Sequence, residues 1–201
     1  MRTAAMLVLS LAAWPHVQDR GLSPAHVRAE FRIFAGHEEI TGSTRLRIMP
    51  TGTREQPTTL TEGAALATNV AAGIYDVQAL RLKQGSIVGI RWAERLVVMY
   101  YPDEAGRHLE VINFQPGFGA LQLRAQKGQL TAYDVAIFPA RERTRPAATP
   151  IEGDGYKLFV VPAGRYDVRV RPAGGAPEAE ETRWFLDIEV PADRTRIKVV
   201  D

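Results

Sequence analysis

The chain of 201 residues contains no cysteine, which excludes disulfides, thiolate metal sites and cysteine nucleophiles. Only four of its 25 basic residues are lysines, and the formal net charge is +2. No run of Lys or Arg forms the electrostatic footprint of a nucleic-acid-binding protein. Beyond residue 13 no apolar run approaches the roughly 20 residues that a membrane helix needs. Four histidines leave little material for imidazole chemistry.

The first residues predict export. The segment MRTAAMLVLSLAA places Arg2 before an apolar run from Ala4 to Ala13. A run of about 7–15 apolar residues after a positive charge is typical of a secretory signal. The alternative, a core helix, is disfavoured by the position at the start of the chain. We assign residues 1–20 to a signal peptide and tail. We expect a protein of the periplasm or the extracellular space, without membrane insertion after signal removal.

After residue 27 the apolar residues recur at every second position. The alternation is clearest in VRAEFRIF (27–34), STRLRIMP (43–50), RYDVRVR (165–171) and TRIKVVD (195–201). Side chains on a strand point alternately to its two faces, so this pattern indicates strands with one buried and one wet face. Clusters of Gly and Pro separate the segments and mark turns. The sequence therefore predicts an all-β protein built as a sandwich.

One octet is written nearly twice: VAAGIYDV at 70–77 and VPAGRYDV at 161–168. A strand–turn–strand corner that recurs indicates two similar β units. We place two β-sandwich modules in tandem, at 24–125 and 128–201, with the polar segment around Lys127 as their boundary. The first module carries an insertion at 85–124. Within it MYYPDEAGRHLEVINF predicts a β-hairpin with arms 96–101 and 108–114, which we expect to be the element that contacts a partner.

Several segments resemble the carboxypeptidase regulatory-like, transthyretin-like (prealbumin-like) β-sandwich modules of secreted bacterial proteins. In the first unit they are AEFRIF, GSTRLRIMP and LATNVAAGIYDVQAL; in the second they are DVAIFPA, KLFVVPAGRYDVRV and FLDIEV with RIKVV. The resemblance implies a seven-stranded Greek-key sandwich of transthyretin or immunoglobulin type. It also implies a non-catalytic accessory or adhesive role. The insertion at 85–124 departs from the usual module.

Aromatic residues supply the candidate binding site, because aromatic side chains contribute much of the energy of interfaces. We select Trp92, Tyr100, Tyr101, His108 and Trp184 as ligand-binding residues. The alternative is that these rings fill the core, as aromatic residues in strands usually do. His108 and Glu110 share a strand face, a spacing that could hold a divalent ion, but a wet hairpin face with ordinary charges is the favoured interpretation. We therefore predict no metal site and no cofactor.

No motif indicates catalysis. No serine lies in a Gly-x-Ser-x-Gly elbow, and the acidic pairs fall in expected loops. We assign no catalytic residue and predict that the chain is not an enzyme. The function that the sequence favours is surface recognition of a protein partner in the cell envelope or outside the cell. A carbohydrate-binding accessory module that holds a cell-surface glycan is the alternative, and a hydrolase is a more distant one. Nucleic acid is not an expected partner.

Overall fold

The fold is described from a computed structural model, which describes residues 26–53, 58–60, 63, 66–100, 107–125, 130–174 and 181–200. The expected signal peptide, the expected boundary around Lys127 and the candidate Tyr101 all lie outside these residues. Within the described part the only helical segments are two 3-10 turns, η1 (Thr41–Ser43) and η3 (Leu130–Ala132). The prediction of an all-β sandwich is confirmed.

The residues that the structure describes form four sheets. In the N-terminal half, the first outer sheet has the order β4 (Thr58–Leu60), β3 (Thr44–Pro50), β6 (Gly73–Lys83), β7 (Ser86–Val98). The first inner sheet contains β1 (His26–Ala35), β2 (Glu38–Glu39), β5 (Leu66–Ala71) and β8 (Arg107–Asn113). In the C-terminal half, the second inner sheet has the order β11 (Ile151–Gly153), β12 (Tyr156–Pro162), β9 (Phe118–Ala125), β15 (Thr195–Val200). The second outer sheet has the order β10 (Tyr133–Pro139), β13 (Gly164–Pro172), β14 (Arg183–Val190).

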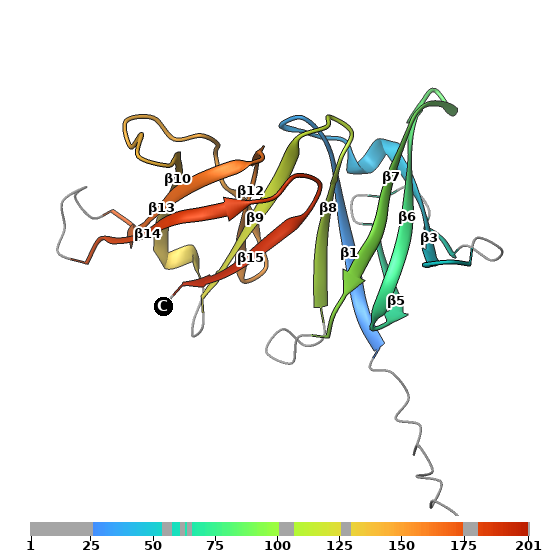
Figure 1. Cartoon of the computed structure of the whole chain (residues 1–201), viewed down its shortest axis with the longest axis horizontal. Helices are drawn as coiled ribbons and strands as arrows, with labels where there is room; N and C mark the ends of the chain where they lie inside the picture. The colour runs from blue at the N-terminus through green and yellow to red at the C-terminus, as the bar shows by residue number, and fades with distance from the viewer. Residues whose placement is uncertain are drawn as a thin grey trace, which may run out of the picture.

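The sheets stack as four layers (Figure 1). One apolar core lies between the first outer and first inner sheets, and a second lies between the two sheets of the C-terminal half. A third cluster joins the two inner sheets; its buried members are Phe34, Leu109, Val111, Phe118, Ala120, Leu158 and Val160. Since burial of apolar area is the main favourable term in folding, this third cluster holds the halves together. Strands β8, β9 and β12 are consequently buried on both faces along most of their length.

The two halves pair their strands in the same way. Strand β1 pairs antiparallel with β5 and parallel with β8, and β9 pairs antiparallel with β12 and parallel with β15. In the outer sheets β6 lies between β3 and β7, and β13 lies between β10 and β14. The expectation of two similar units therefore agrees with the strand pairing.

The pairing corrects the expected insertion at 85–124. Strands β7 and β8 are the counterparts of β14 and β15, so they belong to the repeated pattern. Strand β9 is the counterpart of β1 and opens the second half. The halves thus meet at residues 114–117, about ten residues before the boundary that we expected at 125–128. The division into two domains stays a prediction, with its boundary moved to this link.

The hairpin expected from MYYPDEAGRHLEVINF is also wrong. Residues 96–98 of its first arm belong to β7, which pairs with β6, and its second arm falls on β8, which pairs with β1. The segment crosses from the outer to the inner sheet of one sandwich. Two alternating arms around a Pro- and Gly-containing loop resemble a hairpin in sequence, but the arms find their partners elsewhere. A parallel partner such as β1, about eighty residues away, leaves no local signal.

The repeated octet forms matching corners between sheets. Each corner joins an inner strand to an outer one, β5 to β6 and β12 to β13, through a single residue. The Tyr75 hydroxyl donates a hydrogen bond to the Ala71 carbonyl at 2.7 Å, and the Tyr166 hydroxyl donates one to the Pro162 carbonyl at 2.6 Å. A tyrosine hydroxyl that binds upstream backbone is a recurrent device of β-sandwiches. Burial raises the pKa of both tyrosines.

The aspartate after each tyrosine supports a bulge in the next strand. Oδ1 of Asp76 accepts the Arg95 N–H at 2.9 Å, and Oδ1 of Asp167 accepts the Asp187 N–H at 3.0 Å. Arg95 and Asp187 both have left-handed backbones, with φ of 54° and 58°. Such a conformation is unfavourable for residues other than glycine, so a buried carboxylate that binds its N–H stabilises it. The octet therefore encodes a corner and the bulge beside it.

Candidate functional site

Exposed apolar side chains are concentrated on the hairpin formed by β6 and β7. We call this hairpin, together with the two residues that follow it, the β6–β7 ribbon (residues 73–100). Ten large hydrophobic side chains of the described part are exposed. Seven of them lie on this ribbon, namely Ile74, Ile87, Val88, Ile90, Val97, Met99 and Tyr100. Scattered exposed apolar residues are normal, whereas a concentration of this kind marks an interaction surface. The ribbon is therefore the candidate functional site.

The exposed side chains form two groups at the two ends of the ribbon. The lower group contains Ile74, Val97, Met99 and Tyr100, which are 43–50% exposed. Ile74 and Val97 lie opposite each other in the register of β6 and β7. The tip group contains Ile87, Val88 and Ile90, which are 54–56% exposed and follow the turn that joins the two strands.

The repeat shows that the ribbon exceeds what the fold requires. Its counterpart is the β13–β14 pair, in which β14 has eight residues against thirteen in β7. The sequence of β14 is RWFLDIEV, with charged residues at three of its eight positions, and Leu186 is its only exposed large hydrophobic residue. Both halves close their cores with the same pairing, so the longer apolar end of β7 serves something other than folding. Comparison of RWFLDIEV with SIVGIRWAERLVV is the sequence signal that would have identified it.

The structure separates the two candidate tryptophans. Trp92 lies on β7 opposite Gln78, and Trp184 lies on β14 opposite Arg169, so they occupy equivalent places in the repeat. The first and second outer sheets are at opposite ends of the stack, which keeps the two rings from sharing a site (Figure 1). One face of the Trp184 ring is covered by the Arg143 guanidinium, 4.5 Å from the ring centroid.

Of the other candidates, Tyr100 belongs to the lower group of the ribbon and Tyr101 lies outside the described residues. His108 differs from the expectation of a surface residue. It is 5% exposed on β8, opposite Ala29 of the core, and its Nε2 lies 3.6 Å from Oε2 of Glu110. The expected wet hairpin face does not exist there, because β8 is an inner strand.

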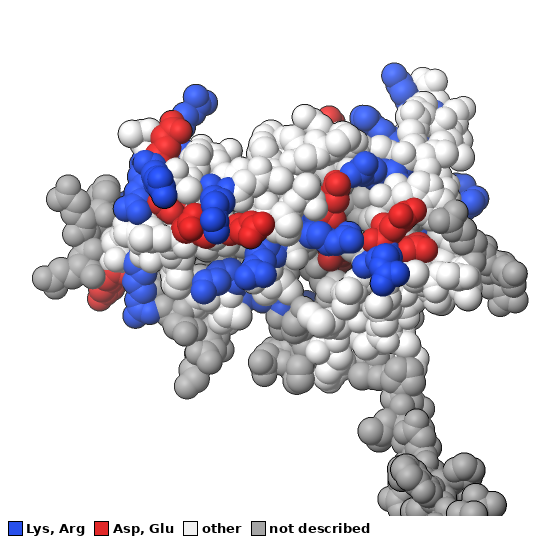
Figure 2. Space-filling model, viewed as in Figure 1, with Lys and Arg blue, Asp and Glu red and all other residues white. Residues whose placement is uncertain are grey.

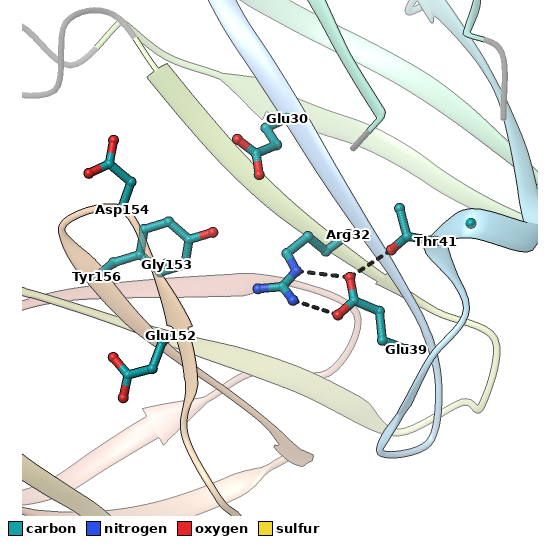
Figure 3. A pocket seen from close by; sticks show the side chains of 9 residues that line it. Glu30, Arg32, Glu39, Thr41, Glu152, Gly153, Asp154 and Tyr156 are labelled. Atoms are coloured by element: carbon teal, nitrogen blue, oxygen red, sulfur yellow. Dashed lines mark hydrogen bonds and ion pairs between the residues drawn. The ribbon is translucent and has the colours of Figure 1, made fainter. Parts of the chain in front are cut away.

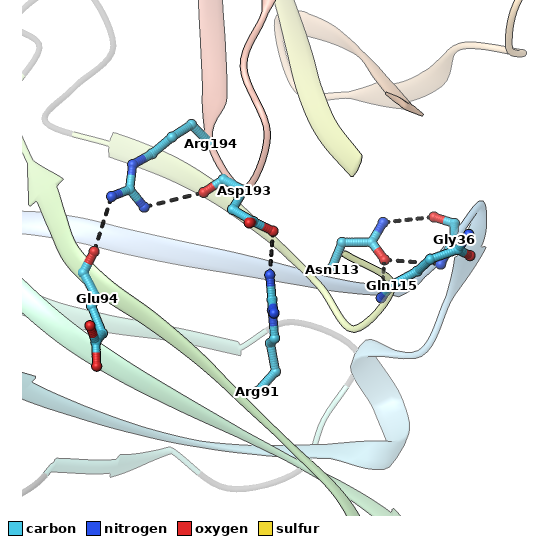
Figure 4. A network of polar contacts seen from close by, with 7 residues as sticks. All are labelled: Gly36, Arg91, Glu94, Asn113, Gln115, Asp193 and Arg194. Atoms are coloured by element: carbon cyan, nitrogen blue, oxygen red, sulfur yellow. Dashed lines mark hydrogen bonds and ion pairs between the residues drawn. The ribbon is translucent and has the colours of Figure 1, made fainter. Parts of the chain in front are cut away.

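Side chains from the β14–β15 turn fasten the two halves together. Asp193 forms an ion pair with Arg91, and Nη2 of Arg194 donates to the Glu94 carbonyl at 3.0 Å, so the turn holds β7 at its middle (Figure 4). Thr195 donates from its backbone N–H at 3.0 Å and from its hydroxyl at 2.9 Å to Oε1 of Glu110. The ribbon is thus fixed to a rigid support along its centre, with both ends exposed.

A polar cleft of about 550 Å³ opens beside the inner sheets. Its lining combines β1, β2 and η1 with β11, β12 and the turn between them; the residues are Glu30, Arg32, Glu39, Thr41, Gly42, Glu152, Gly153, Asp154 and Tyr156 (Figure 3). Nε of Arg32 donates to Oε1 of Glu39 at 3.0 Å, and Nη2 donates to Oε2 at 2.5 Å.

The charges of the cleft are largely neutralised within the protein. Besides Glu39, Glu152 accepts from Lys157 at 2.6 Å and Asp154 accepts from Arg107 at 2.8 Å. Burial would raise the pKa of Glu39, but hydrogen bonds from Arg32 and Thr41 outweigh it and hold that pKa below its ordinary value. Burial and the Glu30 carboxylate raise the pKa of Tyr156. These ion pairs link neighbouring strands to one another. We therefore interpret the cleft as a structural ion-pair network.

Within the described ranges no group of three or more His, Asp or Glu side chains is arranged to hold a metal ion. No helix of the described part is both long and apolar enough to cross a membrane.

No protein-family model and no curated protein matches the chain, so the resemblance to carboxypeptidase regulatory-like modules stays a prediction. Among solved structures, the Bacillus anthracis TIE protein is 14% identical over 87% of this chain and 34% of its own, with a TM-score of 0.29. A leucine-rich repeat protein from Bacteroides thetaiotaomicron is 12% identical over 87% and 26%, with a TM-score of 0.32. A tip fimbrial protein from Porphyromonas gingivalis is 9% identical over 87% and 94%, with a TM-score of 0.31. TM-scores this low carry no conclusion about function.

Proposed function

We propose that the chain is an exported, non-catalytic recognition protein that binds a protein partner through the lower group of the β6–β7 ribbon. The observation that carries the proposal is the concentration of exposed apolar side chains on this ribbon, seven of the ten in the described part. The partner belongs to the cell envelope or the extracellular space if the N-terminal segment acts as a secretory signal.

The composition of the lower group suits a protein interface. Tyrosine and methionine are enriched in such interfaces relative to the rest of protein surfaces, and Tyr100 and Met99 lie next to the paired Ile74 and Val97. Each side chain is about half exposed, so burying the remainder contributes roughly 1 kcal/mol apiece and roughly 4 kcal/mol together. That is about a thousandfold in affinity, which is the size of a hot-spot cluster.

The test compares variants of the immobilised chain. Val97→Asp and Tyr100→Ala are expected to lose a partner captured from envelope and secreted fractions. Leu186→Asp on β14 is the matched control, because Leu186 is 57% exposed on the repeat-equivalent strand. We expect the control to keep the partner and all three variants to melt within about 2 °C of the wild type, as surface changes usually do. Capture of the same proteins by all variants would contradict the proposal.

A separate variant, Trp92→Ala, addresses the carbohydrate alternative. A glycan array that gives signal with the wild type and loses it with Trp92→Ala would assign the outer face of β7 to a sugar. A silent array would remove that alternative.

A further inference from the structure

The tip of the β6–β7 ribbon, which we define as Arg81–Trp92, differs in chemistry from the lower group. Its sequence is RLKQGSIVGIRW, which combines three basic residues, four aliphatic residues and one tryptophan with no acidic residue. We propose that this tip is a peripheral docking surface for an anionic lipid bilayer. The inference goes beyond the proposed function, since it concerns other side chains and another class of partner. It involves contact with the bilayer surface and no spanning segment.

The aliphatic side chains of the tip are available for such contact. Ile87, Val88 and Ile90 are each more than half exposed, although they lie within β7, a strand of the outer sheet. The register of β6 and β7 shifts between Arg81 and Leu82, which leaves Val88 as an extra residue between Ile87 and Gly89. Exposed aliphatic side chains enter the boundary between headgroups and acyl chains, where apolar area is removed from water.

The charges around the tip have the sign that anionic lipids attract. Lys83 is exposed and Arg81 half-buried on β6, and Arg45 and Arg47 are exposed on the neighbouring β3. In Figure 2 the upper end of the ribbon, at the upper right, carries blue atoms and no red ones. Each basic residue near an anionic membrane surface strengthens binding by about fivefold, and long basic side chains reach the headgroups while their stems stay on apolar surface.

Asp193 of the β14–β15 turn pairs with Arg91, so the positive field of the tip comes from Arg81 and Lys83. The acidic residues on β6 and β7 do not cancel this field. Asp76 is buried at the other end of β6, where it accepts hydrogen bonds from the Arg95 N–H and the Thr51 hydroxyl. Glu94 follows the tip, next to the bulge of β7. Trp92 closes the tip on the side of the protein body, and an indole ring with one apolar side and one N–H suits the headgroup level of a bilayer.

Size favours a lipid surface over a second protein at this place. A standard protein interface removes ~800 Å² from each partner. Three aliphatic side chains at the end of a projecting hairpin offer far less surface area. Beyond the tip, β6 and β7 already pack on the core and bind the β14–β15 turn, so they add no free surface to it. A bilayer needs no matching shape, so a small apolar tip with flanking cations is sufficient for reversible attachment.

The experiment sediments the full chain with vesicles of phosphatidylcholine alone and of phosphatidylcholine mixed with phosphatidylglycerol. We expect the chain to pellet with the mixed vesicles only and to be released by raised salt, which screens the attraction. Lys83→Glu changes the charge by two units and is expected to weaken binding by about twentyfold. Val88→Asp, which removes apolar area, should weaken binding by at least about tenfold.

Two matched variants keep the test decisive. Leu186→Asp adds the same charge to an equally exposed position of β14 and should bind vesicles almost as the wild type does. Lys83→Gln, at the exposed end of β6, should fold normally and lose about fivefold in binding. A wild type that stays in solution with mixed vesicles, or tip variants that bind as well as the wild type, would overturn the proposal. The proposal would also be overturned if a photo-crosslinker at position 90 captured a protein and the chain did not sediment with mixed vesicles. None of these results depends on the lower group. The variants Val97→Asp and Tyr100→Ala therefore test the proposed function independently of membrane binding.

Discussion

Removing one hydroxyl from each corner tests the duplicated scaffold quantitatively. Tyr166→Phe keeps the ring and deletes the donor that reaches the Pro162 carbonyl at 2.6 Å; Tyr75→Phe does the same to the Ala71 carbonyl at 2.7 Å. A partly buried hydrogen bond of this kind contributes about 1–1.5 kcal/mol to the free energy of unfolding. For a chain of this size that corresponds to a fall in melting temperature of about 2–6 °C.

The two changes should have the same effect, because the two corners share distance, burial and neighbours. Urea denaturation followed by circular dichroism gives each free energy of unfolding. The double variant should lose the sum of the two, since the hydroxyls belong to separate cores. A neutral result for either change would show that the hydroxyl does not stabilise its corner. A large loss of unfolding free energy at one corner and none at the other would refute the view that the two copies of the octet stabilise their corners in the same way.

Three further changes probe the support of the fold. Gly119→Ala drives a Cβ into the Pro191 carbonyl oxygen of the β14–β15 turn and should cost at least about 2 kcal/mol. Gly42→Ala meets no atom within 4 Å and should cost far less, and equal melting temperatures would contradict this. Burial would raise the pKa of Asp167, but hydrogen bonds from backbone and arginine donors outweigh it and lower that pKa. Its contribution to stability is therefore present above the unfolded pKa and is lost as the pH falls below about 4, so denaturation of Asp167→Asn should depend less on pH in that range than denaturation of the wild type. Thr195→Val deletes the hydroxyl that donates to the buried Glu110 and accepts the Val111 N–H, whereas the backbone N–H of residue 195 still donates to Glu110. The change should lower the free energy of unfolding by about 1–3 kcal/mol, which an unchanged urea midpoint would disprove.

Sequence alternation predicted the strands that have one wet face. Segments 27–34, 43–50 and 165–171 coincide with β1, β3 and β13, because each packs its apolar side chains on one core and exposes the others. The octet was also readable as a paired corner. Its hydrogen bonds follow from the residues that repeat, Tyr and Asp, at the same offsets from each turn.

Pairing between distant strands was not readable in the same way. Strands β8 and β9 are buried on both faces, so polar residues such as Glu110, Gln122 and Arg124 lie inside and the alternation disappears. Their partners β1, β12 and β15 are distant in sequence, and no local pattern reports a parallel neighbour. Because β8 and β9 show neither alternation nor a local pairing signal, the sequence does not reveal that they belong to the repeat, and residues 85–124 resemble an insertion.

The candidate site was found in part. Attention to aromatic residues led to β7 through Trp92 and Tyr100, but it also selected the buried His108 and the distant Trp184. The sequence does not single out the aliphatic residues of the ribbon, because individual Ile and Val residues are common in strands. They stand out once β7 is compared with β14, its counterpart in the repeat, and the strand pairing is what identifies that counterpart.

Site-specific photo-crosslinking in cells that produce the chain tests the recognition function most directly. A photoreactive residue is placed at position 97, in the lower group of the ribbon, or at position 186 on the repeat-equivalent strand; Val97 and Leu186 are 50% and 57% exposed. The proposed function predicts one dominant protein adduct at position 97 and none at 186. The same adducts at both positions, or none at 97, would contradict it.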